Sequence, residues 1–380
     1  MTNSHNLPRL YKGGFFFGLH YALISYASSS YLERFLSPNQ SGFVFSAGSF
    51  LGVALVLASL FIWKRNSRLL LALVLPLIIF LLVLLALLPY KEAVGTIFAM
   101  YLGLNFLGWF LFDVAIEHDS ADKKTGTIRG SYLTFVNIAW LFSPLISGIL
   151  ITESGFKSLF LVSSAMGMIT LLILKKDIPK AINESRKTLA LRPDFWIANP
   201  EVKKVLFVNF ILQFFYSAMV VVAPIYLIHE LGIGWETLGK IFFIMLLPFV
   251  LVDYPMGRLA DKKGNEKKIL LLGLSIMAFA TIAFGLWGAT SIFAAAIILY
   301  FTRVGASIVE IMADSYFFKH VGERNLGSIA LYRSMTPVAF LLGPIFGLIY
   351  SSALSYGFVF ITVGTIVLLS TIVATRIKNI

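Results

Sequence analysis

Cysteine is absent from the 380-residue sequence, charged residues are scarce, and histidine occurs only five times. Without cysteine the chain forms neither a disulfide bond nor a thiolate nucleophile. The histidines are dispersed and lack the spacing of metal ligands. Charged residues make up 13% of the chain and hydrophobic residues 58%, whereas about a quarter of a soluble domain is charged. The sequence is therefore not that of an ordinary soluble domain, and we expect no enzymatic activity, metal or cofactor.

Hydrophobic residues come in stretches of roughly 18 to 25, which is enough for a helix to cross a hydrocarbon layer of about 30 Å. In lipid each backbone amide must bond within its own segment, so these stretches indicate helices rather than strands. The sequence predicts an all-α membrane protein with twelve transmembrane helices. The spans cover residues 12–32, 41–62, 69–89, 93–113, 128–152, 157–174, 204–228, 237–256, 268–288, 291–314, 327–350 and 354–375.

Lys and Arg gather on one side of this twelve-span topology. The opposite side holds only Arg34, Lys91, Lys157 and Lys240 of the 31 basic residues, and Arg303 and Arg333 fall within spans. Basic residues in short loops are retained in the cytoplasm. We therefore expect a multi-pass protein of the plasma (inner) membrane with both termini cytoplasmic. The net charge of +12 then reflects topology and contact with anionic membrane lipids, not binding of nucleic acid.

A polar segment at residues 175–203 divides the spans six and six. The sequence predicts an N-terminal bundle at 1–174, a cytoplasmic linker at 175–203 and a C-terminal bundle at 204–380. Spans five and eleven share a pattern at an offset of 200, in which small residues and a proline recur. It consists of Ala139, Ser143, Pro144, Ser147 and Gly148 in span five, and of Ala339, Gly343, Pro344 and Gly347 in span eleven. Small residues allow close helix packing and proline bends a helix, so the pattern favours two pseudo-symmetric six-helix bundles.

The loop between spans eight and nine carries a second pattern. It reads Gly257-Arg258-Leu259-Ala260-Asp261-Lys262-Lys263-Gly264 and resembles the signature loop of the major facilitator superfamily (MFS). The equivalent loop at residues 61–68 has neither the glycines nor the aspartate. The pattern of span five is similar to the antiporter signature of the same superfamily, of the drug/proton type. The resemblance implies the MFS fold and transport by alternating access, with export favoured.

Three charged residues fall on one face of span ten. Glu310 and Asp314 follow Arg303 at i+7 and i+11, about 10 and 16 Å along the helix axis. A charge inside the bilayer costs several kcal/mol, so it lines a cavity or is paired. Arg303 is a candidate ligand for an anionic group and Glu310 a candidate proton carrier. The alternative is an internal salt bridge, and for Asp314 and Asp113, near cytoplasmic helix ends, we favour such a gate or structural role.

Asp253 and Arg333 lie within a turn or two of the inner surface. The sequence suggests that they pair across spans eight and eleven, beside the Asp261 loop, and so lock the cytoplasmic gate. Snorkelling of Arg333 to the interface is the alternative.

Spans one, four, seven and ten line the cavity in the resembled superfamily. The polar residues of these spans that we expect to contact substrate are His20, Tyr21, Asn105, Gln213, Tyr216 and Arg303. His20 is a second candidate for proton coupling, because histidine titrates near neutral pH. Packing between helices is the alternative role for the asparagine and the glutamine.

Together these features predict a monomeric secondary active transporter of a small molecule. We expect proton-coupled export of a hydrophobic or amphipathic compound. Two alternatives stay open: a proton-coupled uptake symporter of a small organic solute, and a non-transporting membrane sensor on the same fold. The sequence does not identify the substrate.

Overall fold

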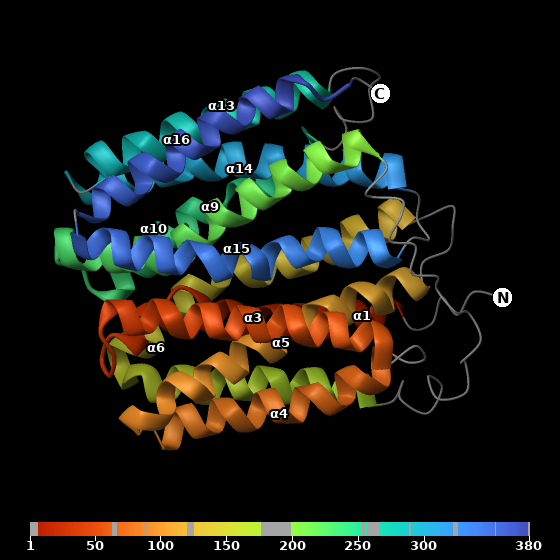
Figure 1. Cartoon of the computed structure of the whole chain (residues 1–380). Coiled ribbons are helices and arrows are strands. Elements are labelled where there is room, and N and C mark those ends of the chain that lie inside the picture. Colours follow the sequence, from red (N-terminus) through yellow and green to blue (C-terminus); the bar gives the residue numbers. More distant parts are fainter. Residues whose placement is uncertain are drawn as a thin grey trace.

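The computed structural model describes ten stretches of the chain (Figure 1). They are residues 7–62, 67–88, 90–119, 125–175, 199–252, 255–256, 266–288, 290–321, 326–353 and 355–378. Within these ranges the regular structure is all α-helical, without a strand. The prediction of an all-α protein is therefore confirmed for the described residues.

The helices before the linker form a group that we call the N-half. They are α1 (Leu7–Ser25), α2 (Ser28–Leu32), α3 (Pro38–Ile62), α4 (Ser67–Leu87), α5 (Lys91–Asp119) and α6 (Thr125–Lys175). The first predicted span corresponds to α1 and α2 together. Helix α6 contains both the fifth and the sixth predicted spans, which meet at Gly155 with φ 73°. A positive φ suits glycine, which has no Cβ to clash with the backbone, so the sharp turn falls at this residue.

The helices after the linker form the C-half. They are α9 (Pro200–Leu231), α10 (Trp235–Leu246), α11 (Pro248–Leu251), α13 (Glu266–Trp287), α14 (Ile292–Val321), α15 (Leu326–Ala353) and α16 (Tyr356–Thr375). Helix α9 begins at an Asn199 cap, whose side chain accepts from the backbone amides of Glu201 and Val202. It ends at Gly232 in the left-handed region, φ 60°.

Eight helices of the described chain are long and apolar enough to cross a membrane. Helix α6 counts once although Gly155 divides it, and the eighth predicted span is split at Leu247 and Pro248 into α10 and α11. The total of twelve transmembrane helices therefore stays a prediction.

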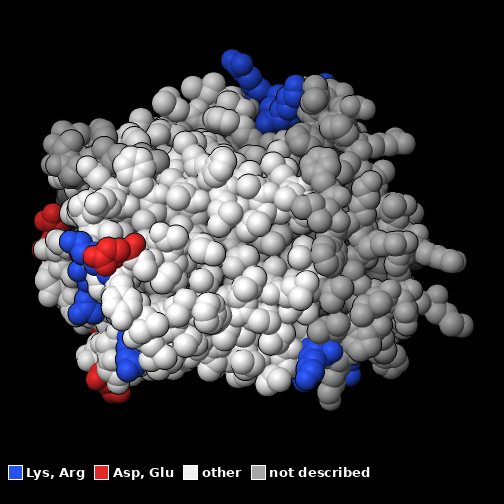
Figure 2. Space-filling view, turned by 60° about the horizontal axis from the view of Figure 1, so that its bottom comes forward, with Lys and Arg blue, Asp and Glu red and all other residues white. Residues whose placement is uncertain are grey.

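The two halves lie one above the other in Figure 1, and the helices run lengthwise through both. Helix α6 packs against α1 and α4, and α13 packs against α14 and α16. The halves meet mainly where α3 contacts α15 and where α6 contacts α10. Figure 2 shows a broad face without charged side chains, with blue and red residues near its edges. This distribution suits a protein surrounded by lipid.

Close packing between the halves depends on two glycines. A Cβ atom at Gly148 of α6 would lie 2.6 Å from the carbonyl oxygen of Trp235, and one at Gly239 of α10 would overlap the carbonyl oxygen of Pro144. Gly148, one of the small residues predicted to allow close packing in span five, thus lets the backbone of α6 meet that of α10. This contact lies at the end of the N-half where α6 turns at Gly155. At the same end, the Glu33 carboxylate lies 3.9 Å from Nε2 of His229 in α9.

Candidate functional site

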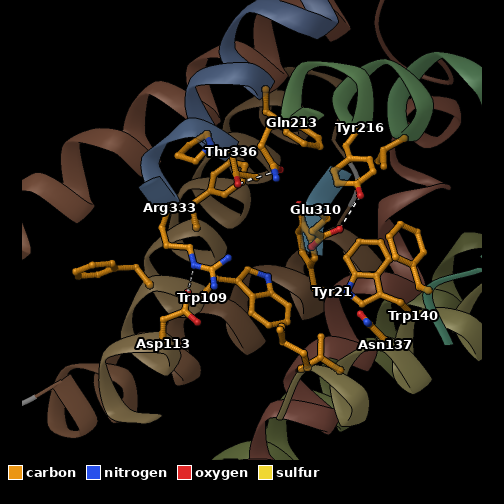
Figure 3. Close-up of a pocket in the computed structure, with 18 of the residues that line it drawn as sticks. Tyr21, Trp109, Asp113, Asn137, Trp140, Gln213, Tyr216, Glu310, Arg333 and Thr336 are labelled. Carbon is orange, nitrogen blue, oxygen red and sulfur yellow. Dashed lines mark hydrogen bonds and ion pairs between the residues drawn. The ribbon is translucent and has the colours of Figure 1, made fainter. Parts of the chain in front are cut away.

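A cavity of about 260 Å³ lies between the halves, and both contribute to its walls (Figure 3). Its lining is mostly apolar, and ten of the 24 lining residues are aromatic: Tyr21, Tyr26, Phe106, Trp109, Phe110, Tyr132, Trp140, Tyr216, Phe249 and Phe340. Four ionisable side chains also reach it, namely Asp113, Arg303, Glu310 and Arg333. An apolar pocket with a few converging polar groups is the usual form of a small-molecule site.

Arg303 of α14 is 1% exposed, although it carries a charge within a membrane-spanning helix. Its Nη2 atom donates to the Tyr26 hydroxyl at 3.5 Å, which is a long hydrogen bond. Its Cζ atom lies 5.2 Å from the ring centres of both Phe215 and Tyr216, where the negative faces of the rings attract it. Its Nε and Nη1 atoms have no hydrogen-bond partner among the described residues.

Glu310 lies two turns along α14 from Arg303. Its Oε2 atom accepts a hydrogen bond of 2.6 Å from the Tyr216 hydroxyl of α9 (Figure 3). Tyr216 therefore contacts both ionisable residues, Arg303 through its ring and Glu310 through its hydroxyl. A carboxyl group in such a cavity is suited to bind and release a proton.

Arg333 of α15 pairs with Asp113 of α5, with Nε and Oδ2 2.9 Å apart. The pair joins the halves near the end of α5 and the start of α15, away from the Gly148 contact. The partner proposed for Arg333 from the sequence, Asp253, lies outside the described residues. Arg333 thus pairs with Asp113, a residue for which the sequence favoured a gate or structural role.

A chain of hydrogen bonds connects α9 with α15 beside the cavity. The Thr336 hydroxyl donates to Oε1 of Gln213 at 3.1 Å, Nε2 of Gln213 to Asn209 at 3.4 Å, and Asn209 to the Tyr332 carbonyl at 3.0 Å. The Tyr332 hydroxyl in turn donates to Asp314 at 2.5 Å. Gln213 therefore lines the cavity in a fixed orientation, while Asp314 is held within the C-half.

His20 and Asn105 are fully buried and are not among the residues that line the cavity. Nδ1 of His20 lies 2.6 Å from the Phe17 carbonyl, and its ring packs 4.8 Å from the Phe17 ring. Asn105 donates to the Tyr101 carbonyl at 2.8 Å. Neither side chain is open to the cavity in this conformation, so their direct contact with substrate stays a prediction.

The other predicted residues that the structure describes lie away from the cavity. Gly343 and Gly347 of α15 pack on Ser217 and Val222 of α9, so they serve contact within the C-half. Pro144 and Pro344 lie inside α6 and α15 without ending either helix. The signature-loop residues Gly257, Arg258, Asp261 and Gly264 lie outside the described residues, as Asp253 does.

Sequence reasoning missed most of the aromatic lining. Tyr21 lies 6.3 Å from Trp109 and 5.8 Å from Trp140 between ring centres, and Tyr26 lies 6.1 Å from Trp140. Trp140 falls in the middle of a predicted span, whereas membrane tryptophans usually lie at the interfaces. That central position could have indicated that Trp140 lines a cavity. The many phenylalanines gave none, because those facing lipid and those facing a cavity are alike in sequence.

Comparison with known proteins places this architecture in a family. The sequence model of the Major Facilitator Superfamily matches residues 115–329 and 205–378. The fold is similar to the crystal structure of the human organic anion transporter MFSD10 (TETRAN), with a TM-score of 0.72 and 13% sequence identity over 97% of this chain and 98% of that chain. A search of curated proteins found no match. The family match covers more than half of the sequence, and the chain belongs to the Major Facilitator Superfamily of membrane transporters.

Proposed function

We propose that the chain is a secondary active transporter that moves a small hydrophobic or amphipathic solute across the plasma (inner) membrane by alternating access, coupled to protons. The cavity between the halves carries this proposal, because it combines an aromatic lining with one carboxyl group, Glu310, that has no basic partner within ion-pair distance among the described residues. Such a group can exchange a proton with the medium on whichever side the cavity is open to. We place both termini on the cytoplasmic side, and we take the protein to act as a monomer.

Contacts between the halves support alternating access. Helices α6 and α10 meet through backbone at Gly148 and Gly239, near Gly155. Away from this contact the two halves are joined by the Asp113–Arg333 pair. A rocking motion that separates one set of contacts can keep the other, and the cavity lies between them.

Export is our first candidate direction, since the small residues and Pro144 of α6 resemble the antiporter signature. Uptake by symport is the second candidate, and one observation favours it: Arg303 lines the cavity with unused donors. An anion bound there and a proton on Glu310 would attract each other, so the two would travel together. The two candidates differ in whether substrate moves in the same direction as the proton or in the opposite direction.

Transport is tested with purified protein in liposomes. A thermal-shift screen of small molecules first supplies a compound that binds. We expect wild-type protein to accumulate or expel this compound against its gradient only when a proton gradient is imposed. Binding without movement of any compound would support the sensor and overturn the transporter.

Glu310→Gln tests the proton site. We expect this variant to lose gradient-driven accumulation almost completely, because an amide does not titrate as a carboxyl group does. It should still exchange substrate between the two sides of the membrane. Glu236→Gln, at an exposed position of α10, is the matched control and should accumulate substrate normally. Undiminished uphill transport by the Glu310 variant would exclude this residue as the proton carrier.

A further inference from the structure

Arg303 lacks a counter-charge among the residues that the structure describes. No carboxylate of the described chain lies within ion-pair distance of its guanidinium, and Nε and Nη1 have no partner. Guanidinium donors that are buried and unpaired are costly, so native proteins generally satisfy them. Phe215 and Tyr216 stabilise the charge only through their ring faces. Arg303 lines a cavity, so its buried and unpaired donors point to an anionic ligand.

The charges of the cavity limit that ligand to one negative charge. Arg333 is already neutralised by Asp113 at 2.9 Å, so Arg303 is the cation that remains among the described lining residues. A phosphate dianion would need a second cation. A planar carboxylate needs only one guanidinium, which can bind both of its oxygens.

The space beside Arg303 is aromatic. Tyr26, which accepts the hydrogen bond from Arg303, lies beside Trp140, and Trp140 lies beside Tyr21. A volume of about 260 Å³ is at the small end of ligand sites, roughly 300–1,000 Å³. One or two fused rings therefore suit the site better than a lipid.

We propose that the cavity binds a small aromatic monocarboxylate, with its carboxylate on Arg303 and its ring against Tyr26 and Trp140. This inference rests on the proposed transport function, since it names the substrate class of the same site. It goes further in assigning a charge to the substrate.

Proton binding follows from the same arrangement. Glu310 faces Tyr216 of α9, Arg303 and Asp314 of its own helix, and Arg333 of α15. An anion on Arg303 cancels a positive charge near Glu310 and thereby favours its neutral form. Carboxylate binding should consequently take up a proton from the medium.

Binding in detergent, without any gradient, tests the proposal separately from transport. The probes are benzoate and 2-naphthoate, each compared with its neutral amide and its primary amine analogue. We expect the carboxylates alone to raise the thermal midpoint of wild-type protein. Arg303→Gln should weaken carboxylate binding roughly 10- to 100-fold, the effect of losing hydrogen bonds to a charged group. Lys240→Gln removes a positive charge at an exposed site and should leave binding unchanged.

Two further measurements keep the test decisive. Arg303→Lys keeps the charge but not the planar fork, so it should keep the preference for carboxylates with reduced affinity, even if Arg303→Gln fails to fold. Calorimetry in two buffers should show proton uptake on carboxylate binding, and none in Glu310→Gln. Equal binding of amides, or indifference of the wild type to both carboxylates, would overturn the proposal. Transport of neutral compounds by such a protein would leave the proposed function standing.

Discussion

Single residues decide what the cavity can hold. Moving a charged side chain to the centre of a bilayer costs about 2.5–3.5 kcal/mol or more. Each aromatic face that contacts Arg303 returns roughly 0.5–2 kcal/mol, and the long hydrogen bond to Tyr26 adds little. Two such faces return about 1–4 kcal/mol in all, which offsets the cost fully only at the upper end of that range, and the proposed anion would supply the remainder.

Glu33 offers a prediction about pH. Burial raises the pKa of the Glu33 carboxyl, and His229, at 3.9 Å, opposes the shift. A raised pKa means that the folded protein holds the proton more tightly than the unfolded chain. The contribution of Glu33 to stability is thus largest at acidic pH and is lost as pH rises through its folded pKa.

Glu33→Gln removes this titration. We expect the variant to have a higher thermal midpoint than wild type at neutral pH, with the difference shrinking as the pH is lowered to about 4.5. Midpoints measured in detergent across that range provide the check. A variant less stable than wild type at neutral pH would mean that attraction to His229 outweighs burial.

Sequence spacing alone placed Arg303 and Glu310 on one face of one helix, and the structure brings both to the cavity. Pairing between helices was harder to predict. Arg333 meets Asp113, a residue more than 200 positions earlier, because the partner depends on how each helix is rotated about its axis. His20 shows the same limit: its helix was predicted, but its side chain is buried against Phe17 and does not line the cavity.

At the scale of helices, the turn between α9 and α10 allows a matched comparison. Gly232 and Gly234 both have open space where a Cβ would lie, but only Gly232 has a positive φ, 60°. Alanine in the left-handed region costs roughly 1–2 kcal/mol. We therefore expect Gly232→Ala to lower the thermal midpoint by about 1–3 °C.

Gly234→Ala is the control, since its backbone is extended and nothing opposes the added methyl group. We expect it to melt like wild type or slightly higher, because alanine reduces the freedom of the unfolded chain. Equal losses in the two variants would show that the turn, and not its backbone angle, sets the cost.

The predicted spans agree with the described helices because a bilayer demands long apolar segments whatever the fold. The breaks inside them were not predicted. Helix α1 stops at Ser25 and α2 starts at Ser28 within one predicted span, and Leu247 separates α10 from α11. A span that is apolar on every side gives no periodic signal of its rotation or its breaks.

At the scale of the whole protein, the Asp113–Arg333 pair should couple the two halves energetically. Breaking a largely buried pair leaves one charge unpaired, so Asp113→Asn and Arg333→Gln should each destabilise the protein, by about 1–3 kcal/mol after allowance for partial exposure. The double variant should lose less than the sum of the two.

Thermal or denaturant unfolding of the four proteins measures this coupling. Lys240→Gln breaks an exposed pair with Glu236 on a single helix and should change stability by less than 1 kcal/mol. Additive losses in the double variant would show that the cross-half pair contributes no interaction energy of its own.

Arg303 and Glu310, which Tyr216 connects, also determine how much net charge each transport cycle carries. If one anion and one proton occupy the site together, each cycle carries no net charge, and the membrane potential, worth about 2.3 kcal/mol per charge per 100 mV, neither drives nor opposes it. Flux would then follow the pH difference and the substrate gradient. A carrier built in this way would continue to work in a depolarised cell.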